Sequence, residues 1–405
     1  MGRAGPLLFV HNSADLYGAS QAMLRVLREL FAAGERPIVV LPERGPLEEK
    51  LAAIPIERVF DSSLSVITRR AVSPLRLPLL VLRLPVSVLR LRRLIRRRSV
   101  RLVHTNSGVI FSPALAARLA GVPHIWHVRE SFREFGALWK PYSKYVTRFS
   151  HRVVAISRAV AEQFPEATNV VVIYDGIRIP WSGSEADEAR GHFRELYGLA
   201  STDLVVGCVG RIKFGRKGQE HLVRAASILE RRGVRAKYLM VGTTSPGSEE
   251  HLPRLHRLIA SEGVGDNFVF TGDLADPWPA YAAMDVLVLP SAQQEPFGLV
   301  VTEAMASARP VVATSPGGAA EQVVDGETGY LVPLGDELAL VDRLATLLSD
   351  AALRQAMGLR GLARVREQFS LGTTVACLQT LYREAAGEAA ADDEVPLPRA
   401  REGSS

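Results

Sequence analysis

The sequence predicts an α/β protein with two domains, each built on a parallel sheet covered by helices. Its 405 residues are too many for one ordinary hydrophobic core. A hydrophobic content of 47% is sufficient to fill two cores. Short apolar segments of strand length alternate with longer amphipathic segments, which is the pattern of consecutive βαβ units. We therefore expect a first domain over residues 1–178 and a second over 190–370.

The expected first domain begins with an apolar strand that runs into a loop over residues 7–13. A helix follows over 19–30, with apolar residues spaced three and four apart along one face. Further strands are expected at 37–41, 101–104, 124–127, 153–155 and 170–173. Asp175 and Gly176 follow the last strand and mark the end of the domain.

The expected second domain follows a polar stretch at 180–202, which holds the linker and an early helix at 192–197. Its strands are expected at 204–211, 237–242, 268–272, 286–289 and 310–314, and its next helix at 219–230. A C-terminal helix is expected at 371–386. The tail at 387–405 has few apolar side chains to bury, so we expect it to be disordered.

Two glutamates flank the start of a predicted helix between the strands at 286–289 and 310–314. Glu295 lies in the loop and Glu303 in the second turn. Ligands of parallel sheets sit beyond the carboxyl ends of the strands, and a helix N-terminus favours a phosphate there. A carboxylate would be repelled from a diphosphate by about 4 kcal/mol at about 4 Å and an effective dielectric of roughly 20. We therefore expect both glutamates to accept hydrogen bonds from sugar or ribose hydroxyls; the alternative is one solvated glutamate and one partner of the helix dipole.

The residues EPFGLVVTEAMA at 295–306, followed by PVVAT at 310–314, resemble the glutamate-pair signature of glycosyltransferase family 4. VGR at 209–211 with KG at 217–218 resembles the basic motif of the same family. The resemblance implies a retaining, nucleotide-sugar-dependent enzyme of GT-B fold, whose two Rossmann-like domains face a central cleft. It also implies that the helix at 371–386 crosses back to the first domain. One departure is Ala308 where the family has glycine, which costs stability only if φ is positive there.

The resemblance assigns the donor side of the site. It implies that Glu295 grips donor-sugar hydroxyls and that Glu303 holds the ribose. The leaving diphosphate would be bound by two cations and by amides at the helix start: Arg211, Lys217, Phe297, Gly298 and Leu299. Such preorganised charge can stabilise a departing diphosphate without a metal, and we see no DxD motif that indicates one. Two basic loop residues are also compatible with solvated surface positions.

The same resemblance assigns a glycine and a histidine in the first domain. Gly18, in the strand-to-helix turn, would let the diphosphate approach the backbone, although Tyr17 replaces a second common glycine and a plain turn is the alternative. His127, at a strand end, would contact the reacting sugar as a catalytic residue; the alternative is a structural histidine. Weaker acceptor-side candidates are Arg129, Glu130, Asn106 and Ser107.

A basic segment lies between Asp61 and Glu130, where thirteen arginines occur without any acidic residue. Arginines recur every seven residues, at 69, 76, 83, 90 and 97, beside an apolar stripe at 77, 81, 84, 88, 91 and 95. This pattern predicts an amphipathic helix, which we expect Pro78 and Pro85 to kink or interrupt. Residues 69–101 could lie on an anionic membrane; the alternative is that the stripe faces its own sheet. Nucleic acid is excluded as a partner because the segment has no aromatic residues to stack on bases.

Several classes of protein are disfavoured by what the sequence lacks. Cys208 and Cys377 are far apart and have no spacing typical of a disulfide framework or a zinc site. No GxGxxG follows the first strand, which counts against a dinucleotide-dependent oxidoreductase. No signal peptide or uncharged 18-residue apolar run is seen, so we expect a cytoplasmic protein, peripheral at the inner face of the membrane.

The sequence thus predicts a metal-independent glycosyltransferase that needs no cofactor. Its substrates would be a nucleotide-sugar donor and the hydroxyl of a glycan or lipid-linked acceptor. Three alternatives stay open: a nucleotide-sugar epimerase, an inverting transferase of the same fold, and a non-catalytic protein that binds sugar nucleotides.

Overall fold

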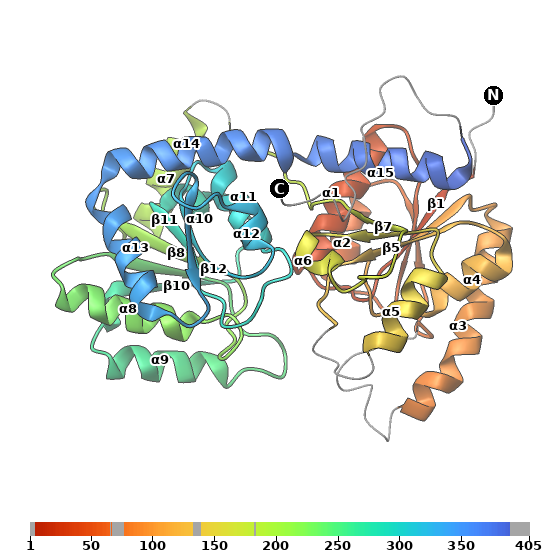
Figure 1. Cartoon of the computed structure of the whole chain (residues 1–405), viewed down its shortest axis with the longest axis horizontal. Coiled ribbons are helices and arrows are strands. Elements are labelled where there is room, and N and C mark those ends of the chain that lie inside the picture. Colours follow the sequence, from red (N-terminus) through yellow and green to blue (C-terminus); the bar gives the residue numbers. More distant parts are fainter. Residues whose placement is uncertain (1–4, 65, 67–76, 133–138, 182–183, 389–405) are drawn as a thin grey trace. The chain divides into compact units, whose positions relative to one another are not determined.

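The computed structural model describes residues 5–64, 66, 77–132, 139–181 and 184–388. It consists of two compact units (Figure 1): unit 1 is Met1–Gly176 with Leu371–Ser405, and unit 2 is Ile177–Ser370. Each unit contains one parallel sheet covered by helices, which confirms the predicted fold class of two Rossmann-like domains. The predicted disordered tail beyond 388 and the predicted helical arginines at 69 and 76 lie outside the described residues.

Unit 1 has a seven-stranded sheet in the order β3-β2-β1-β4-β5-β6-β7, with all neighbours parallel. The strands are β1 (Leu7–Val10), β2 (Ile38–Leu41), β3 (Glu57–Phe60), β4 (Leu102–Thr105), β5 (His124–Val128), β6 (Arg152–Ala155) and β7 (Val170–Val172). The helices are α1 (Gly18–Ala32), α2 (Pro46–Ala52), α3 (Leu77–Arg97), α4 (Ser112–Ala120), α5 (Trp139–Arg148), α6 (Arg158–Ala161) and α15 (Leu371–Ala386). The strand order reverses beside β1, which places a ligand-binding switch point between β1 and β4.

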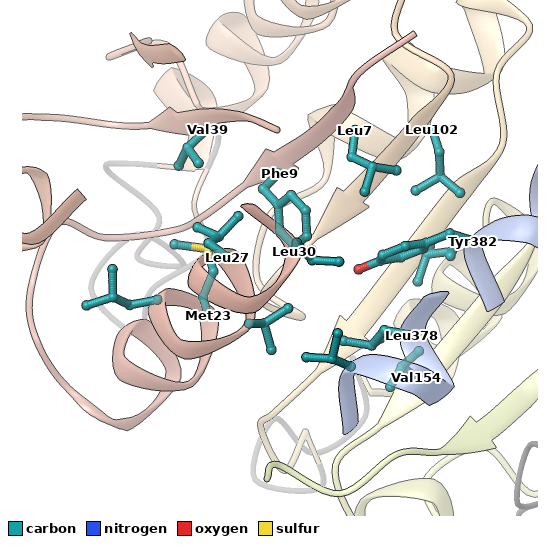
Figure 2. Packing of buried hydrophobic residues seen from close by; sticks show 14 of the residues in the cluster. Leu7, Phe9, Met23, Leu27, Leu30, Val39, Leu102, Val154, Leu378 and Tyr382 are labelled. Atoms are coloured by element: carbon teal, nitrogen blue, oxygen red, sulfur yellow. The ribbon is translucent and has the colours of Figure 1, made fainter. Parts of the chain in front are cut away.

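Successive residues of β1 point to opposite faces of this sheet and so belong to different cores. Leu7 and Phe9 pack with side chains of α1, α2 and α15. Figure 2 labels residues of this cluster from β1, α1 and α15. Leu8 and Val10 pack instead with α3 and α4. The C-terminal helix α15 is therefore part of the core of unit 1, to which it contributes Tyr382.

Helix α3 can be compared with two expectations from the sequence. It is continuous through Pro85, which is exposed, so the proline removes one hydrogen bond on the solvent side without ending the helix. The predicted apolar stripe faces the sheet: Val88, Leu91 and Ile95 are buried in the second core of unit 1. The alternative interpretation of that stripe is therefore the correct one.

Unit 2 has a six-stranded parallel sheet in the order β10-β9-β8-β11-β12-β13. The strands are β8 (Val205–Val209), β9 (Lys237–Val241), β10 (Phe268–Gly272), β11 (Val286–Leu289), β12 (Val311–Ser315) and β13 (Gly329–Pro333). The helices are α7 (Glu185–Leu196), α8 (Gln219–Arg231), α9 (His251–Ser261), α10 (Trp278–Ala283), α11 (Leu299–Ala306), α12 (Ala319–Gln322), α13 (Glu337–Ser349) and α14 (Ala351–Gln368). Helices α8, α9 and α13 share one core with alternate residues of the strands.

Helix α7 occupies about half of the polar stretch at 180–202, which we predicted to hold a linker and an early helix. It begins seven residues before the predicted helix at 192. Arg190 and Arg194 form ion pairs with Asp285 at 2.7 and 3.0 Å, and Arg194 also donates to the carbonyl of Ala283. This helix is held to unit 2 largely by charged hydrogen bonds rather than by an apolar stripe, so hydrophobic periodicity could not reveal its start.

The departure from the family signature at Ala308 carries a cost. Its φ is 53°, in the left-handed region, where a Cβ is unfavourable by about 1–2 kcal/mol. The backbone cannot move away easily because α14 packs against it: a Cβ at Gly358 would lie 2.1 Å from the Ala308 carbonyl oxygen. The condition under which the sequence predicted a destabilising alanine is therefore met.

Candidate active site

The candidate site of unit 2 lies at the carboxyl ends of β8 and β11, which are neighbours at the point where the strand order reverses. The loop after β8 carries Lys217 and leads into α8, and the loop after β11 carries Glu295 and leads into α11. The Lys217 Nζ donates to both carboxylate oxygens of Glu295, at 2.8 and 3.0 Å. The two predicted residues, 78 positions apart in the sequence, thus form an ion pair.

Close packing holds these two loops together. The backbone N–H of Ala292 donates to the carbonyl of Arg216 at 3.0 Å. Gly218 has a φ of 69°, and a Cβ there would lie 1.7 Å from the Pro290 carbonyl oxygen. Only glycine satisfies both conditions, so the glycine of the KG pair is what lets the Lys217 loop approach the Glu295 loop.

Glu295 is a partly buried, charged carboxylate. Burial alone would raise its pKa, but the charge and hydrogen bonds of Lys217, with a hydrogen bond from the Ser291 hydroxyl at 3.2 Å, outweigh burial and lower the pKa below its usual value. Four-fifths of the Glu295 side chain is shielded from solvent. The site therefore holds a fixed negative charge whose positive partner is directly beside it.

The Arg211 side chain contacts a different loop of unit 2. It is exposed and its guanidinium donates to the Ser245 hydroxyl at 3.2 Å, in the loop after β9. Its backbone carbonyl accepts a hydrogen bond from the Gln219 side chain at 2.9 Å. The two basic residues of the predicted motif thus lie on one loop, with their side chains engaged by different partners.

Glu303 is deeper in unit 2 than Glu295. It lies in the second turn of α11, as predicted, and is 7% exposed. Its Oε2 accepts a hydrogen bond from the Tyr281 hydroxyl at 2.7 Å. Tyr281 was not predicted, because it lies in the apolar segment of α10, which gives no signal of a polar contact. The ribose-binding role of Glu303 stays a prediction.

The turn that opens α11 is tightly packed. Phe297 is buried, and its carbonyl accepts a hydrogen bond from the Gln322 side chain at 2.7 Å. Gly298 has a φ of 88° and immediately precedes the first helical residue, Leu299. The backbone N–H of Gly318 donates to the carbonyl of Glu295 at 2.8 Å. The predicted diphosphate-binding amides are therefore part of a rigid turn at a helix N-terminus.

In unit 1, Gly18 is the first residue of α1 and not a turn residue before it. It is exposed, and its φ is not in the left-handed region, so the backbone does not require glycine there. The predicted approach of a diphosphate to Gly18 stays a prediction.

The acceptor-side candidates Asn106 and Arg129 belong to one buried polar cluster at the strand ends of unit 1. The Arg129 Nε donates to the Asn106 Oδ1 at 3.2 Å, and its Nη1 is paired with Asp175. The Asn106 Nδ2 lies 3.1 Å from the Nδ1 of His11, whose Nε2 lies 2.9 Å from the Ser20 hydroxyl. Sequence reasoning missed His11 and used Asp175 only as a domain end. The sequence pattern could have indicated both residues, because His11 and Asp175 each follow a buried strand, and a position at a strand end was the reason for selecting His127.

Glu130 and Ser107 fix the neighbouring turn. The Glu130 carboxylate accepts hydrogen bonds from the Ser107 hydroxyl and from the backbone N–H groups of Gly108 and Arg129, the last two at 2.9 and 3.0 Å. A carboxylate with this many donors is suited to holding the loops after β4 and β5 in place.

His127 is fully buried in β5, and its Nδ1 lies 3.3 Å from the Nε2 of His104. Burial lowers the pKa of His127 well below its usual value, and Arg129 and His104 act in the same direction, so the ring is neutral.

Within the part of the chain that the structure describes, no group of three metal-binding side chains is present. The same part of the chain contains no helix with the length and hydrophobicity needed to span a bilayer.

Comparison with solved structures identifies the fold. HepE from Anabaena, determined with UDP and glucose, superposes with a TM-score of 0.78 over 93% of this chain and 99% of its own, at 24% identity. WaaG, a glycosyltransferase involved in lipopolysaccharide biosynthesis, gives a TM-score of 0.66 over 94% of this chain and all of its own, at 16% identity. At such low identity the likeness establishes the fold, which is that of the GT-B glycosyltransferases.

Sequence comparison defines the family. The family model described as Glycosyltransferase Family 4 matches residues 17–179, and the model described as Glycosyl transferases group 1 matches residues 203–350. The lipopolysaccharide core mannosyltransferase LpcC of Rhizobium leguminosarum is 30% identical over 251 residues, which are 61% of this chain and 68% of LpcC. The chain belongs to glycosyltransferase family 4.

A second relative matches a shorter region. The capsular polysaccharide glycosyltransferase CapM of Staphylococcus aureus is 33% identical over 184 residues, which are 45% of this chain. The chain spans about half the length of that relative, since the match covers 47% of CapM.

Proposed function

We propose that this glycosyltransferase transfers a sugar from a nucleoside diphosphate donor to an acceptor hydroxyl. The observation that carries the proposal is the Lys217–Glu295 ion pair at the switch point of unit 2, beside the start of α11. HepE binds UDP, and a 38% identical mannosyltransferase of Mycolicibacterium smegmatis is described as GDP-mannose-dependent. Both support a nucleotide-sugar donor.

The ion pair gives each residue a task. Lys217 neutralises the Glu295 carboxylate and so reduces the repulsion of about 4 kcal/mol that a carboxylate at about 4 Å exerts on a phosphate. The remaining lone pairs of Glu295 can accept hydrogen bonds from sugar hydroxyls, while Lys217, Arg211 and the α11 N-terminus stabilise the leaving diphosphate. In this proposal the charge of the leaving group is balanced by protein groups, without a metal or cofactor.

Retention of anomeric configuration is part of the same proposal and rests on membership of the family. The names of relatives, which include a lipopolysaccharide core transferase and a phosphatidylinositol mannoside transferase, support a glycan or lipid-linked acceptor. His127, with Asn106 and Arg129 nearby, stays the predicted contact to the reacting sugar and the acceptor.

The proposed function is tested by incubating the chain with UDP-, GDP- and ADP-sugars. One donor is expected to raise the unfolding temperature, since a ligand at a hundredfold excess over its Kd stabilises by about 2.7 kcal/mol. With that donor and a matching glycan or lipid-linked acceptor, NMR of the product should show a new glycosidic bond with the donor's anomeric configuration. A product with the inverted anomeric configuration would contradict the retention part of the proposal. Epimerisation of the donor sugar without transfer to the acceptor would overturn the proposed transfer reaction.

We also propose that the outer face of α3 contacts an anionic membrane, now through a different stripe from the one predicted. Leu82, Val86 and Leu89 lie on this face and are 72%, 45% and 59% exposed. Exposed arginines at 83, 90, 93, 96 and 97 accompany them. An apolar strip within a cationic helix face is suited to the boundary between acyl chains and anionic headgroups.

Vesicle co-sedimentation tests this membrane proposal. Replacing Arg83, Arg93 and Arg97 by glutamine is expected to weaken binding to phosphatidylserine vesicles by about 10²-fold, at about 1 kcal/mol per arginine. Arg90 is left in place because it pairs with buried Asp61. Leu82→Ser with Leu89→Ser should also weaken binding, whereas Leu196→Ser, at an equally exposed position in unit 2, should not. Failure of the wild-type chain to bind such vesicles would end the proposal.

A further inference from the structure

Three buried side chains from three elements form a hydrogen-bonded row in unit 1. The Tyr382 hydroxyl of α15 lies 2.9 Å from the Nδ1 of His104 in β4, and the Nε2 of His104 lies 3.3 Å from the Nδ1 of His127 in β5. All three are at most 2% exposed. Phe9 stacks on the His104 ring at 4.6 Å between centroids, and Tyr382 meets that ring edge-on at 5.8 Å. Figure 2 shows Phe9 and Tyr382 within the core cluster of unit 1.

All three groups of the row keep an uncharged form. Burial lowers the pKa values of His104 and His127 well below the usual range, and Arg129 adds to both shifts. Burial also raises the pKa of Tyr382, so its hydroxyl keeps its proton. Each imidazole therefore carries one proton, and the question is which nitrogen holds it.

The hydrogen bonds determine the two tautomers. The Tyr382 hydroxyl has His104 Nδ1 as its hydrogen-bond partner in the structure. If the hydroxyl only accepted a hydrogen bond from that nitrogen, its own buried proton would have no acceptor. Tyr382 therefore donates to the Nδ1 of His104. The proton of neutral His104 is then on Nε2, which donates to the Nδ1 of His127. His127 in turn carries its proton on Nε2.

The outer nitrogen of this row has no partner. The Nε2 of His127 is buried and makes no hydrogen bond within the part of the chain that the structure describes. A buried N–H without an acceptor is unfavourable, so the row ends at a place that an acceptor oxygen would complete.

We propose that Tyr382 and His104 are positioning residues that hold His127 as the Nε2–H tautomer, a neutral hydrogen-bond donor to a ligand oxygen. That the oxygen belongs to the transferred sugar rests on the proposed function; the tautomer does not. An imidazole held this way cannot accept a proton at Nε2, so His127 orients and polarises a sugar oxygen and does not act as a general base at that nitrogen.

NMR of the full chain labelled with ¹⁵N-histidine tests the row directly. Long-range ¹H–¹⁵N spectra should show His104 and His127 as Nε2–H tautomers at neutral pH, with signals assigned by His104→Gln and His127→Gln. Tyr382→Phe removes the donor to Nδ1 and should shift both rings toward a tautomer mixture. A wild-type His127 in the Nδ1–H form or as imidazolium would overturn the proposal.

Kinetics separate this proposal from the proposed function. Tyr382→Phe is expected to lower kcat about tenfold with little change in the donor KM, as loss of an orienting outer partner does. Tyr238→Phe, a buried tyrosine in unit 2, is the matched control and should leave kcat unchanged. If the tautomers are as expected but His127→Gln transfers sugar normally, the role of His127 in the proposed function fails while the row stands. If Tyr382→Phe changes the ¹⁵N signals of neither His104 nor His127, the proposal that Tyr382 holds their tautomers fails.

Discussion

Replacing Lys217 by glutamine is expected to lower kcat by about 10²–10³-fold, the loss that follows removal of one preorganised donor to developing charge. The variant loses the cation that stabilises the leaving diphosphate in the proposed function. It also leaves the Glu295 carboxylate, one-fifth exposed, without its positive partner. Because burial is then opposed only by the Ser291 hydrogen bond and the charge of Arg216, the pKa of Glu295 should rise, and the acidic limb of the pH–rate profile should move to higher pH.

A double mutant separates catalysis from stability at this pair. Lys217→Gln alone should destabilise unit 2 by about 2 kcal/mol, since a mostly buried charged acceptor loses its donor. Adding Glu295→Gln removes that charge and should restore most of the stability, measured by urea unfolding. If both groups contact the donor, the double mutant stays as inactive as either single mutant.

The matched control is an ion pair of similar geometry that lies on the surface of the same unit. The Arg232 Nη1 lies 2.6 Å from the Asp342 Oδ1, and both side chains are substantially exposed. Arg232→Gln should therefore change neither kcat nor the stability of unit 2 appreciably. Recovery of activity together with stability in the Lys217→Gln, Glu295→Gln double mutant would show that the pair is only structural.

The strands that the sequence predicted are those with a continuous apolar run. β1, β2 and β11 are buried along their length; β1 starts at the predicted residue, and β2 and β11 lie within one residue of their predicted bounds. β3 was missed because two of the four residues of Glu57–Phe60 are charged, at a sheet edge where full burial is not required. β13, also at an edge, begins with glycine and ends with proline, two residues that depress strand propensity.

The pairing of site residues depended on which strands are neighbours. The sequence placed Lys217 and Glu295 each at the carboxyl end of a strand. Their contact required β8 to lie beside β11, which strand order decides and local pattern does not. Helix α3 shows the same limit. Val88, Leu91 and Ile95 have helical spacing, but so do Leu82, Val86 and Leu89, and only packing reveals which stripe meets the sheet.

Unit 1 should unfold in mild acid before unit 2, because it buries four neutral histidines: His11, His104, His124 and His127. Burial is the main cause in each, and it lowers the pKa of His11 to about 4 and that of His124 to about 3. The four histidines of unit 2, at 192, 221, 251 and 256, are all at least partly exposed. Acid should therefore act much more strongly on unit 1.

The direction of this pH effect on stability follows from proton linkage. These folded-state pKa values lie below the unfolded value of about 6.5, so below that pH the unfolded chain binds more protons. Their stabilisation is complete above pH 6.5 and falls by about 1.4 kcal/mol per pH unit for each histidine as the pH drops toward its folded pKa. By pH 4, His11 and His124 should each have cost unit 1 about 3 kcal/mol, a large part of the roughly 5–15 kcal/mol that a domain possesses.

Hydrogen exchange read by mass spectrometry from pH 7 to pH 4 checks this order, with rates corrected for the intrinsic pH dependence. Peptides from β4 and β5 should lose protection before peptides from β8 and β11. His124→Gln keeps a polar group between the Thr105 and Ser150 hydroxyls but cannot titrate, so it should reduce the pH slope of unit 1 by about one proton. An unchanged slope in that variant, or earlier loss of unit 2, would contradict the assignment of acid sensitivity to buried imidazoles. Two of these buried histidines, His104 and His127, also form the row that places a neutral donor at the predicted sugar contact. The burial that keeps their rings neutral therefore also makes the folding stability of unit 1 fall in acid.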